Sequence, residues 1–388
     1  MRNDRNMKKD LISPTAPKDS PYYQIESVGR ACRILRILQS HREGLPLFQL
    51  AKVASLSRPS VFRLLATLQA NGFVAKDSGN TYRLASEHLP GRKYRIGYVS
   101  ETSDSSFYQA VTRDLQEASA RAGIDLVIYD SRDNPDVALQ NAEKMLKENL
   151  DLIIEFQSYA NVGSLISSRA GTKQLPVIAV EMPYPNTIYF GVDNCQAGLM
   201  AGRHLARWAE QHWSGQIDEI LLIGSSNAGA LPEARLTASL LGIHEISPRS
   251  SSSRVTRMDG NWRQDVTYDA VMRYLKKSTS KRILVSAIND PCSIGALAAF
   301  RDSSRLPHCA IVAQNGTMEV RMELRRQTSR LIAAVGYFPE NYGKQLVALA
   351  VDVITRRSPV PNAVFIKHQL LTRKNVSDHY PHRKGKGD

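Results

Sequence analysis

Apolar side chains recur at helical spacing near the start of the chain. Residues 27–38 carry them on one face, Gly44 follows as a stop, and a shorter run over residues 47–54 repeats the pattern. A third run covers residues 58–70, and Ser57 directly before it can cap a helix by accepting a hydrogen bond from a backbone N–H. The pattern predicts three helices in this part of the chain.

Two short runs of alternating polarity follow the third predicted helix. They are residues 73–76 and 81–85, and the Asp-Ser-Gly-Asn segment 77–80 between them is typical of a hairpin turn. Three helices followed by a β-hairpin form a winged helix-turn-helix, which we place at residues 25–85. Residues 1–24 are polar, contain proline and have no periodicity, so we expect a flexible arm there.

The third predicted helix has one apolar face and one polar, basic face. On a helical wheel the buried stripe consists of Val61, Leu64, Leu65 and Leu68, whereas Pro59, Phe62, Arg63 and Ala66 face away. The first turn of a recognition helix is the part that reaches base edges in DNA. The candidate DNA contacts are therefore Arg58, Ser60, Phe62 and Arg63 on this helix, with Lys76 and Arg83 on the hairpin. The alternative is a small helical protein-binding domain with ordinary surface arginines.

Buried-strand runs alternate with helical runs through the rest of the chain. This βα alternation predicts an α/β fold with doubly wound parallel sheets, and the runs are too many for one ordinary open sheet. We expect two lobes that divide near Asn194. The predicted boundaries are a linker at 86–93, a two-lobed domain at 94–373 (lobe 1 at 94–194 and 338–367, lobe 2 at 195–337) and a basic tail at 374–388.

Charge is distributed unevenly between these parts. Residues 1–93 carry 16 Lys and Arg against 7 Asp and Glu, whereas the other 295 residues carry 35 against 30, for a formal net charge of +14. A basic front end on a nearly balanced body favours a polyanion-binding module attached to something else, although a solvated basic surface without a partner has the same composition.

Sequence motifs for catalysis, cofactors and metals are missing. The chain has no GxGxxG, GxxxxGK[ST], HExxH or GxSxG motif, and its four cysteines show no metal spacing, so we expect no cofactor, no metal and buried reduced thiols. The first residues have no apolar segment of a signal peptide, and no run is long and apolar enough for a membrane span. We therefore expect a cytoplasmic protein.

The residues that follow the predicted strands are polar and aromatic. Ligands of open α/β sheets bind beyond the carboxyl ends of strands, so these residues are candidates for a binding site. Carboxylates, amides and aromatic rings without a paired nucleophile and base suit recognition of hydroxyl groups better than catalysis.

Two segments resemble known families. Residues 27–85, and above all the stretch SVFRLLATLQANGFV, resemble the DNA-binding domain of IclR-type regulators, although Pro46 stands where that family often has a Ser or Thr cap. Residues 94–373 resemble the type 1 periplasmic-binding-protein fold of ribose receptors and lactose-repressor-like regulators, through YDSRDNPDVALQNAEKML, VDNCQAGLMAGRHLA and NDPCSIGALAAF.

The second resemblance implies ligand contacts position by position. They are Ser105, Phe107 and Tyr108 after the first strand, Glu181, Arg235, Trp262, Asn289, Asn315 and Tyr337. Met182 replaces an arginine of the family, Asn315 replaces a common aspartate, and either Arg235 or Thr237 occupies the position of the second-lobe arginine.

These observations favour one function over another. The first hypothesis is a one-component transcription regulator that binds a double-stranded DNA operator as a homodimer and senses a small sugar or polyol between its lobes. The second is an α/β enzyme that acts on a sugar or related metabolite and carries an accessory winged-helix domain. We favour the regulator, without enzymatic activity and without a membrane partner.

Overall fold

The computed structural model describes residues 25–41, 44–76, 80–85, 93–355 and 361–381. The chain divides into two compact units, Met1–Arg92 and Lys93–Asp388, and each is described by itself. The predicted arm, most of the predicted linker and the hairpin residues 77–79 lie outside the described residues.

The first unit contains the three predicted helices and the predicted hairpin. Its elements are α1 (Glu26–Ser40), β1 (Leu45–Pro46), α2 (Leu47–Ala54), α3 (Arg58–Ala70), β2 (Val74–Lys76) and β3 (Thr81–Leu84). The hairpin strands β2 and β3 pair antiparallel, and the short strand β1, which was not predicted, extends the sheet on the other side of β3. Pro46 itself precedes the first turn of α2, which begins without a side-chain cap.

Apolar side chains from all three helices and the hairpin form the core of this unit. Val61 and Leu65 of α3 are fully buried and Leu68 is nearly so, whereas Leu64 is only partly buried. The side chain of Ser57 accepts from Ser60 N at 3.4 Å, so the predicted cap is present. The core therefore fixes which face of α3 is exposed.

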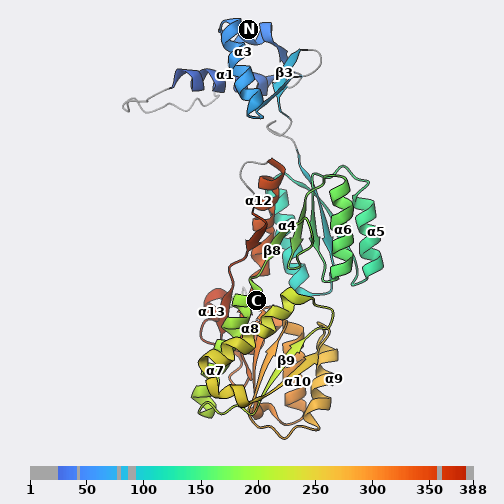
Figure 1. Ribbon diagram of the computed structural model, residues 1–388, viewed down its shortest axis with the longest axis vertical. Coiled ribbons are helices and arrows are strands. Elements are labelled where there is room, and N and C mark those ends of the chain that lie inside the picture. The colour runs from blue at the N-terminus through green and yellow to red at the C-terminus, as the bar shows by residue number, and fades with distance from the viewer. Residues whose placement is uncertain (1–24, 42–43, 77–79, 86–92, 356–360, 382–388) are drawn as a thin grey trace, which may run out of the picture. The chain divides into compact units, whose positions relative to one another are not determined.

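The first lobe of the second unit is a parallel six-stranded sheet with helices on both faces. Its strands have the order β14-β8-β7-β6-β4-β5. They are β4 (Arg95–Ser100), β5 (Asp125–Asp130), β6 (Leu152–Phe156), β7 (Val177–Val180), β8 (Ile188–Gly191) and β14 (Ala363–Phe365). The helices are α4 (Ser106–Arg121), α5 (Pro135–Met145), α6 (Ala160–Thr172) and α12 (Tyr342–Thr355). Figure 1 shows α4 and α12 on one face of the sheet and α5 and α6 on the other.

The second lobe repeats this architecture. Its sheet has the order β10-β9-β11-β12-β13-β15. The strands are β9 (Glu219–Gly224), β10 (Arg254–Asp259), β11 (Ile283–Ala287), β12 (Cys309–Asn315), β13 (Leu331–Gly336) and β15 (Gln369–Thr372). The helices are α7 (Asn194–Trp213), α8 (Ala230–Ile246), α9 (Gln264–Leu275), α10 (Asp290–Asp302), α11 (Met318–Arg325) and α13 (Val376–His379), with 3₁₀ turns at Pro248–Ser252 and Leu306–His308. A third 3₁₀ turn, Pro339–Asn341, packs against α4 and α12 of lobe 1. The prediction of doubly wound parallel sheets is confirmed, except that β15 runs antiparallel to β13.

The chain passes between the lobes three times. It leaves lobe 1 after β8, returns after β13, and leaves again after β14 to add β15 to the sheet of lobe 2. The segment after residue 373 is not simply a tail, because Val376 of α13 is fully buried in the apolar core of lobe 2. Among the described residues, no helix combines the length and the apolar character that a bilayer span requires.

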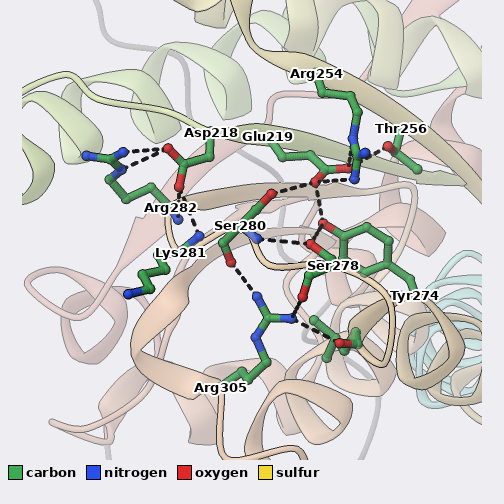
Figure 2. Close-up of polar contacts among 11 residues, drawn as sticks. Asp218, Glu219, Arg254, Thr256, Tyr274, Ser278, Ser280, Lys281, Arg282 and Arg305 are labelled. Atoms are coloured by element: carbon green, nitrogen blue, oxygen red, sulfur yellow. Dashed lines mark hydrogen bonds and ion pairs between the residues drawn. The ribbon is translucent and has the colours of Figure 1, made fainter.

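A dense polar network lies at the amino ends of the lobe 2 strands (Figure 2). We call it the base network, and it consists of Asp218, Glu219, Arg254, Thr256, Tyr274, Ser278, Ser280, Lys281, Arg282 and Arg305. Asp218 accepts from the backbone N–H groups of Lys281 and Arg282 at 2.9 and 3.0 Å, so it holds the loop before β11. The base network lies at the sheet edge opposite the carboxyl ends of the strands.

Candidate functional site

A cavity of about 790 Å³ lies between the two lobes, at the carboxyl ends of their strands. The loops after β4, β6 and β7 line it from lobe 1, and the loops after β9, β10, β11 and β12 line it from lobe 2. Eight of the nine predicted contact residues line this cavity, which we call the cleft: Ser105, Phe107, Tyr108, Glu181, Arg235, Trp262, Asn289 and Asn315. Its volume suits a small molecule.

Tyr337 is the predicted contact that does not line the cleft. It is 1 % exposed, and its hydroxyl donates to Gln314 Oε1 at 2.7 Å. Its ring centroid lies 5.2 Å from the guanidinium carbon of Arg235. Tyr337 therefore supports a cleft residue from behind.

Several cleft residues have a left-handed backbone. The φ angles are 61° for Glu181, 46° for Asn261, 62° for Trp262 and 114° for Asn315. Residues other than glycine avoid this region, and exceptions cluster at binding sites where the surrounding structure holds them. In this chain, residues with the left-handed backbone lie in the turns after β7, β10 and β12 and line the cleft.

Trp262 is held in place by two polar contacts. Its indole Nε1 donates to Asn227 Oδ1 at 3.0 Å, and its carbonyl accepts from Asn289 Nδ2 at 3.0 Å. Asn289 also caps α10, because its Oδ1 accepts from Cys292 N at 2.9 Å. The amide of Asn289 thus holds the Trp262 backbone and the start of α10, which leaves it less capacity for ligand hydroxyls than its position suggested.

Glu181 and Arg235 form a buried ion pair between the lobes. Arg235 Nη2 lies 3.1 Å from Glu181 Oε2, and the side chains are 6 % and 10 % exposed respectively. The Tyr342 hydroxyl donates to Glu181 Oε1 at 2.6 Å, and Arg235 also donates to the carbonyl of Ile288 and to the side chain of Asn194. Burial raises the pKa of Glu181, and the neighbouring Arg235 offsets this only in part.

Close helix packing places Arg235 in the cleft. Gly198 of α7 lies against α8 so closely that an added Cβ would come within 2.2 Å of the Arg235 carbonyl oxygen. Thr237, the other candidate for this position, is exposed and contacts Arg257 instead. Of the two candidates, Arg235 is therefore the cleft residue.

The loop after β4 contributes aromatic rings and a carboxylate. The rings of Tyr108 and Phe156 have centroids 4.2 Å apart, while Phe107 packs edge-on against Phe156 and is 7 % exposed. Glu101 accepts from the Tyr108 hydroxyl at 2.9 Å and from Ser158 Oγ at 2.8 Å. Burial raises the pKa of Glu101, because the hydrogen bonds from Ser158 and Tyr108 compensate only partly.

Asp290 is a second cleft carboxylate that sequence reasoning did not select. It is 2 % exposed, and its Oδ2 accepts from Thr317 N at 2.6 Å. Its Oδ1 has no hydrogen-bond partner among the described residues. Burial raises the pKa of Asp290 to about 7. Glu101 directly follows β4, and Asp290 lies three residues after the end of β11, so their places beyond strand ends could have identified both.

The predicted DNA contacts lie on the surface of the first unit. Arg58, Phe62 and Arg63 of α3 are exposed and Ser60 is half-buried. Neither Arg58 nor Arg63 forms an ion pair with a described residue. On the hairpin, the exposed Lys76 ammonium lies 5.4 Å from the ring centroid of Tyr82, and Arg83 is exposed. The surface therefore offers free cations at the start of α3.

Comparison with known proteins gives one curated relative and many similar folds. The relative is an HTH-type transcriptional regulator of Mycobacterium tuberculosis, 32% identical over 118 residues, which are 30% of this chain. The match spans 42% of the regulator's own length, well under two thirds.

The solved structures resemble the second unit. A solute-binding protein of Actinobacillus succinogenes with bound D-allose has a TM-score of 0.64 at 15% identity, over 74% of this chain and 100% of its own. One from Bacillus halodurans with bound myo-inositol has a TM-score of 0.64 at 16% identity, over 74% and 97%. One from Agrobacterium vitis with bound allitol has a TM-score of 0.65 at 14% identity, over 74% and 98%. At these identities the likeness shows the fold.

Two family models match the chain at the places that the sequence patterns indicated. Residues 27–78 match the IclR helix-turn-helix domain. Residues 96–358 match the periplasmic binding protein domain, and this match covers more than half of the chain. Both resemblances are thus confirmed, and the domains found are of DNA-binding and ligand-binding types. The chain belongs to the periplasmic-binding-protein domain family and carries an IclR helix-turn-helix domain in front of it.

Proposed function

We propose that the protein is a one-component transcription regulator that binds DNA through its first unit and a small sugar or polyol in its cleft. The observation that carries the proposal is the pairing, in one chain, of a helix-turn-helix with free surface arginines and a cleft that combines an oriented indole with carboxylates and amides. We propose no enzymatic activity. Because chromosomal DNA is its proposed partner, we place the protein in the cytoplasm.

The DNA half of the proposal rests on α3. A recognition helix reads bases with its N-terminal residues, and in α3 Arg58 and Ser60 lie in the first turn and Phe62 and Arg63 in the second. Arginine donates to guanine edges or phosphates, and an aromatic ring can contact the thymine methyl group. Lys76 and Arg83 suit phosphate contacts from the hairpin. Since one short helix reads few bases, we propose a homodimer on a pseudo-palindromic operator.

The effector half rests on the cleft. An indole face covers the apolar C–H face of a sugar ring, while carboxylates and amides accept or donate to its hydroxyls. Similar folds were solved with D-allose, myo-inositol and allitol bound, which supports a polyhydroxylated ligand here as well. A ligand shifts a protein between two conformations only if it binds one of them more tightly than the other. The effector therefore acts by making more contacts with the cleft in one arrangement of the lobes than in the other.

DNA binding is tested by selecting genomic fragments with the full-length protein and measuring affinity at rising salt. Binding should weaken steeply with salt, because lysines and arginines displace counterions from the phosphates. Arg63→Ala should lower operator affinity about tenfold or more, whereas Arg121→Ala, a control on exposed surface of the second unit, should leave it unchanged. A flat salt response, or equal affinities of wild type and Arg63→Ala, contradicts the proposed DNA half. Sedimentation of the protein–operator complex as one protomer contradicts the dimer.

Effector binding is tested by tryptophan fluorescence with a library of sugars and polyols. Of the three tryptophans, Trp262 lines the cleft, whereas Trp208 and Trp213 pack against each other with ring centroids 4.9 Å apart. A bound effector should change the emission, and Trp262→Ala should abolish the change and the effector's influence on operator binding while operator binding itself persists. Full effector response in Trp262→Ala shows that the effector binds elsewhere.

A further inference from the structure

The cleft is strongly acidic in a basic protein. Its lining includes seven carboxylates, Glu101, Asp104, Asp133, Glu181, Asp265, Asp290 and Glu319. The basic side chains of the lining are Arg235 and Arg263, with no lysine or histidine among the described lining residues. The full chain has a formal net charge of +14, so the acidic cleft is not a consequence of overall composition. Walls of one sign concentrate ligands of the opposite sign.

Both arginines are already paired. Arg235 lies 3.1 Å from Glu181, and Arg263 Nη2 lies 2.8 Å from Asp265 Oδ2. The other five carboxylates form no ion pair with any described residue. The cleft lining therefore holds more carboxylates than cations, seven against two, and five of the carboxylates have no ion-pair partner among the described residues.

Neutral donors only partly satisfy these five carboxylates. The Tyr159 hydroxyl donates to Asp133 Oδ1 at 2.6 Å, and Ser106 Oγ donates to Glu319 Oε2 at 3.1 Å. Ser106 belongs to lobe 1 and Glu319 to lobe 2, so this contact spans the cleft. Both donors are neutral, so they leave the negative charge of these two carboxylates without a counter-charge from an ion pair among the described residues.

Asp290 supplies an independent sign of a missing cation. Its side chain is almost fully buried and its Oδ1 has no partner among the described residues, while the nearby Glu319 adds a like charge. The basic side chain that interacts electrostatically with Asp290 and Glu319 is Arg321. It forms no ion pair with either carboxylate, and its guanidinium carbon lies 3.7 Å from the ring centroid of Tyr380. Buried carboxylates in proteins are normally paired or bound to cations.

We propose that the effector is a polyhydroxylated molecule that carries a protonated amine, such as an amino sugar or an amino polyol. This proposal rests on the proposed function, in which the cleft binds the effector. The ammonium group lies beside the unpaired carboxylates, with Asp133 on one side of the cleft and Glu319 on the other, and the rings of Trp262 and Tyr108 offer faces that attract a cation. Phosphorylated sugars and sugar acids are repelled by the same carboxylates.

The test uses matched ligands on the full-length protein. The probes are glucosamine, galactosamine, mannosamine and 1-amino-1-deoxyglucitol, each with its neutral parent, its N-acetyl form and the corresponding uronic or aldonic acid, measured by calorimetry and thermal shift. At least one amine should bind about tenfold or more tightly than its neutral parent, a difference of ~1.4 kcal/mol, and its advantage should shrink as salt rises. The N-acetyl form, which has no charge, should lose that advantage.

Variants assign the effect to the carboxylates. Asp133→Asn and Glu319→Gln should each lower the affinity for the amine about tenfold more than the affinity for its neutral parent, because the amides keep an acceptor oxygen for hydroxyls but lose the negative charge. Glu245→Gln is the control, because Glu245 forms an exposed ion pair with Arg203 and does not line the cleft. It should change neither affinity.

The outcomes separate this inference from the proposed function. The inference is overturned if neutral or anionic sugars bind as tightly as every amine, or if no amine of the panel binds. If neutral sugars nevertheless change Trp262 emission, the regulator proposal stands and only the amine is wrong. If no sugar of any charge changes the emission and no genomic fragment is bound, the regulator proposal fails as well.

Discussion

Glu155 of β6 and Glu219 of β9 are both completely buried, but their surroundings are opposite. Glu219 accepts from Arg254 at 3.0 and 2.9 Å, from Thr256 and Tyr274 at 2.6 Å each, and from Ser280 at 3.0 Å. Neither carboxylate oxygen of Glu155 has a hydrogen-bond partner among the described residues. Burial raises the pKa of both, but the hydrogen bonds of Glu219 reverse the shift and lower its pKa, whereas the pKa of Glu155 stays well above its usual range.

A similar contrast separates two regions of the second unit, the base network and the cleft, although Glu155 itself does not line the cleft. The base network satisfies its carboxylates with hydrogen bonds, as Figure 2 shows for Asp218 and Glu219, and the pKa of each is lowered. At the cleft, burial raises the pKa of Glu101, Glu181 and Asp290. Charge on Asp218 and Glu219 therefore stabilises the fold, whereas charge on the buried cleft carboxylates Glu101, Glu181 and Asp290 opposes folding.

The largest effect is expected at the centre of the base network. Glu219→Gln replaces two acceptor oxygens by one oxygen and one amide donor, so several of the five donated hydrogen bonds are lost and the free energy of unfolding should fall by about 3 kcal/mol. Chemical denaturation at pH 7 measures the change. Glu245→Gln, which removes a surface ion pair of the same lobe, should cost less than about 1 kcal/mol. Equal costs in the two variants contradict the comparison.

An effect of opposite sign is expected at Asp290. Its pKa is about 7 in the folded protein against 3.8 for an unperturbed Asp carboxyl, so the folded state holds its proton more tightly and the free energy of unfolding falls as pH rises from about 4 to about 7. Asp290→Asn removes the ionisable carboxyl and with it this fall in the free energy of unfolding. The variant should be more stable than wild type by about 1–3 kcal/mol at pH 8, and the difference should vanish near pH 4. Denaturation curves across this pH range test it, and a variant less stable than wild type at pH 8 contradicts the raised pKa.

The smallest effect is expected at Glu155. Burial raises the pKa of Glu155 well above the ordinary value and so favours its neutral form in the folded protein, and neutral glutamine has nearly the same shape. Glu155→Gln should therefore change the free energy of unfolding by less than about 1 kcal/mol at pH 6, in contrast to the same substitution at Glu219. If Glu155→Gln lowers the free energy of unfolding about as much as Glu219→Gln, then Glu155 has hydrogen-bond partners in solution and the contrast between the two glutamates is wrong.

Local features were predictable from the sequence. The cap at Ser57, the ends of α3 and the buried residues Val61 and Leu65 follow from short-range rules, and α2 has the predicted bounds 47–54. The alternation of strands and helices likewise predicted two parallel sheets. Strand β1 escaped prediction because two residues form no pattern and pair only through β3.

Placement within the cleft was only partly predictable. The choice between Arg235 and Thr237 depended on how α8 rotates against α7, which the glycine contacts decide and no periodicity reveals. Tyr337 follows a strand like the other candidates, but it packs behind Arg235 rather than beside the cavity. The pairing of Arg235 with Glu181 joins residues 54 positions apart and becomes visible only in the structure.

The three crossings between the lobes impose an order on biosynthesis. Helix α12 covers lobe 1 with buried Tyr342 and Leu346, and strand β14 completes its sheet, but the ribosome makes both after the whole parallel part of lobe 2. The helix-turn-helix is continuous in sequence and is made first. Since domains fold as units during synthesis, the nascent chain has a folded DNA reader before either lobe is complete. The sensor is thus finished last, and chains interrupted before α12 carry a DNA-binding domain that no effector can control.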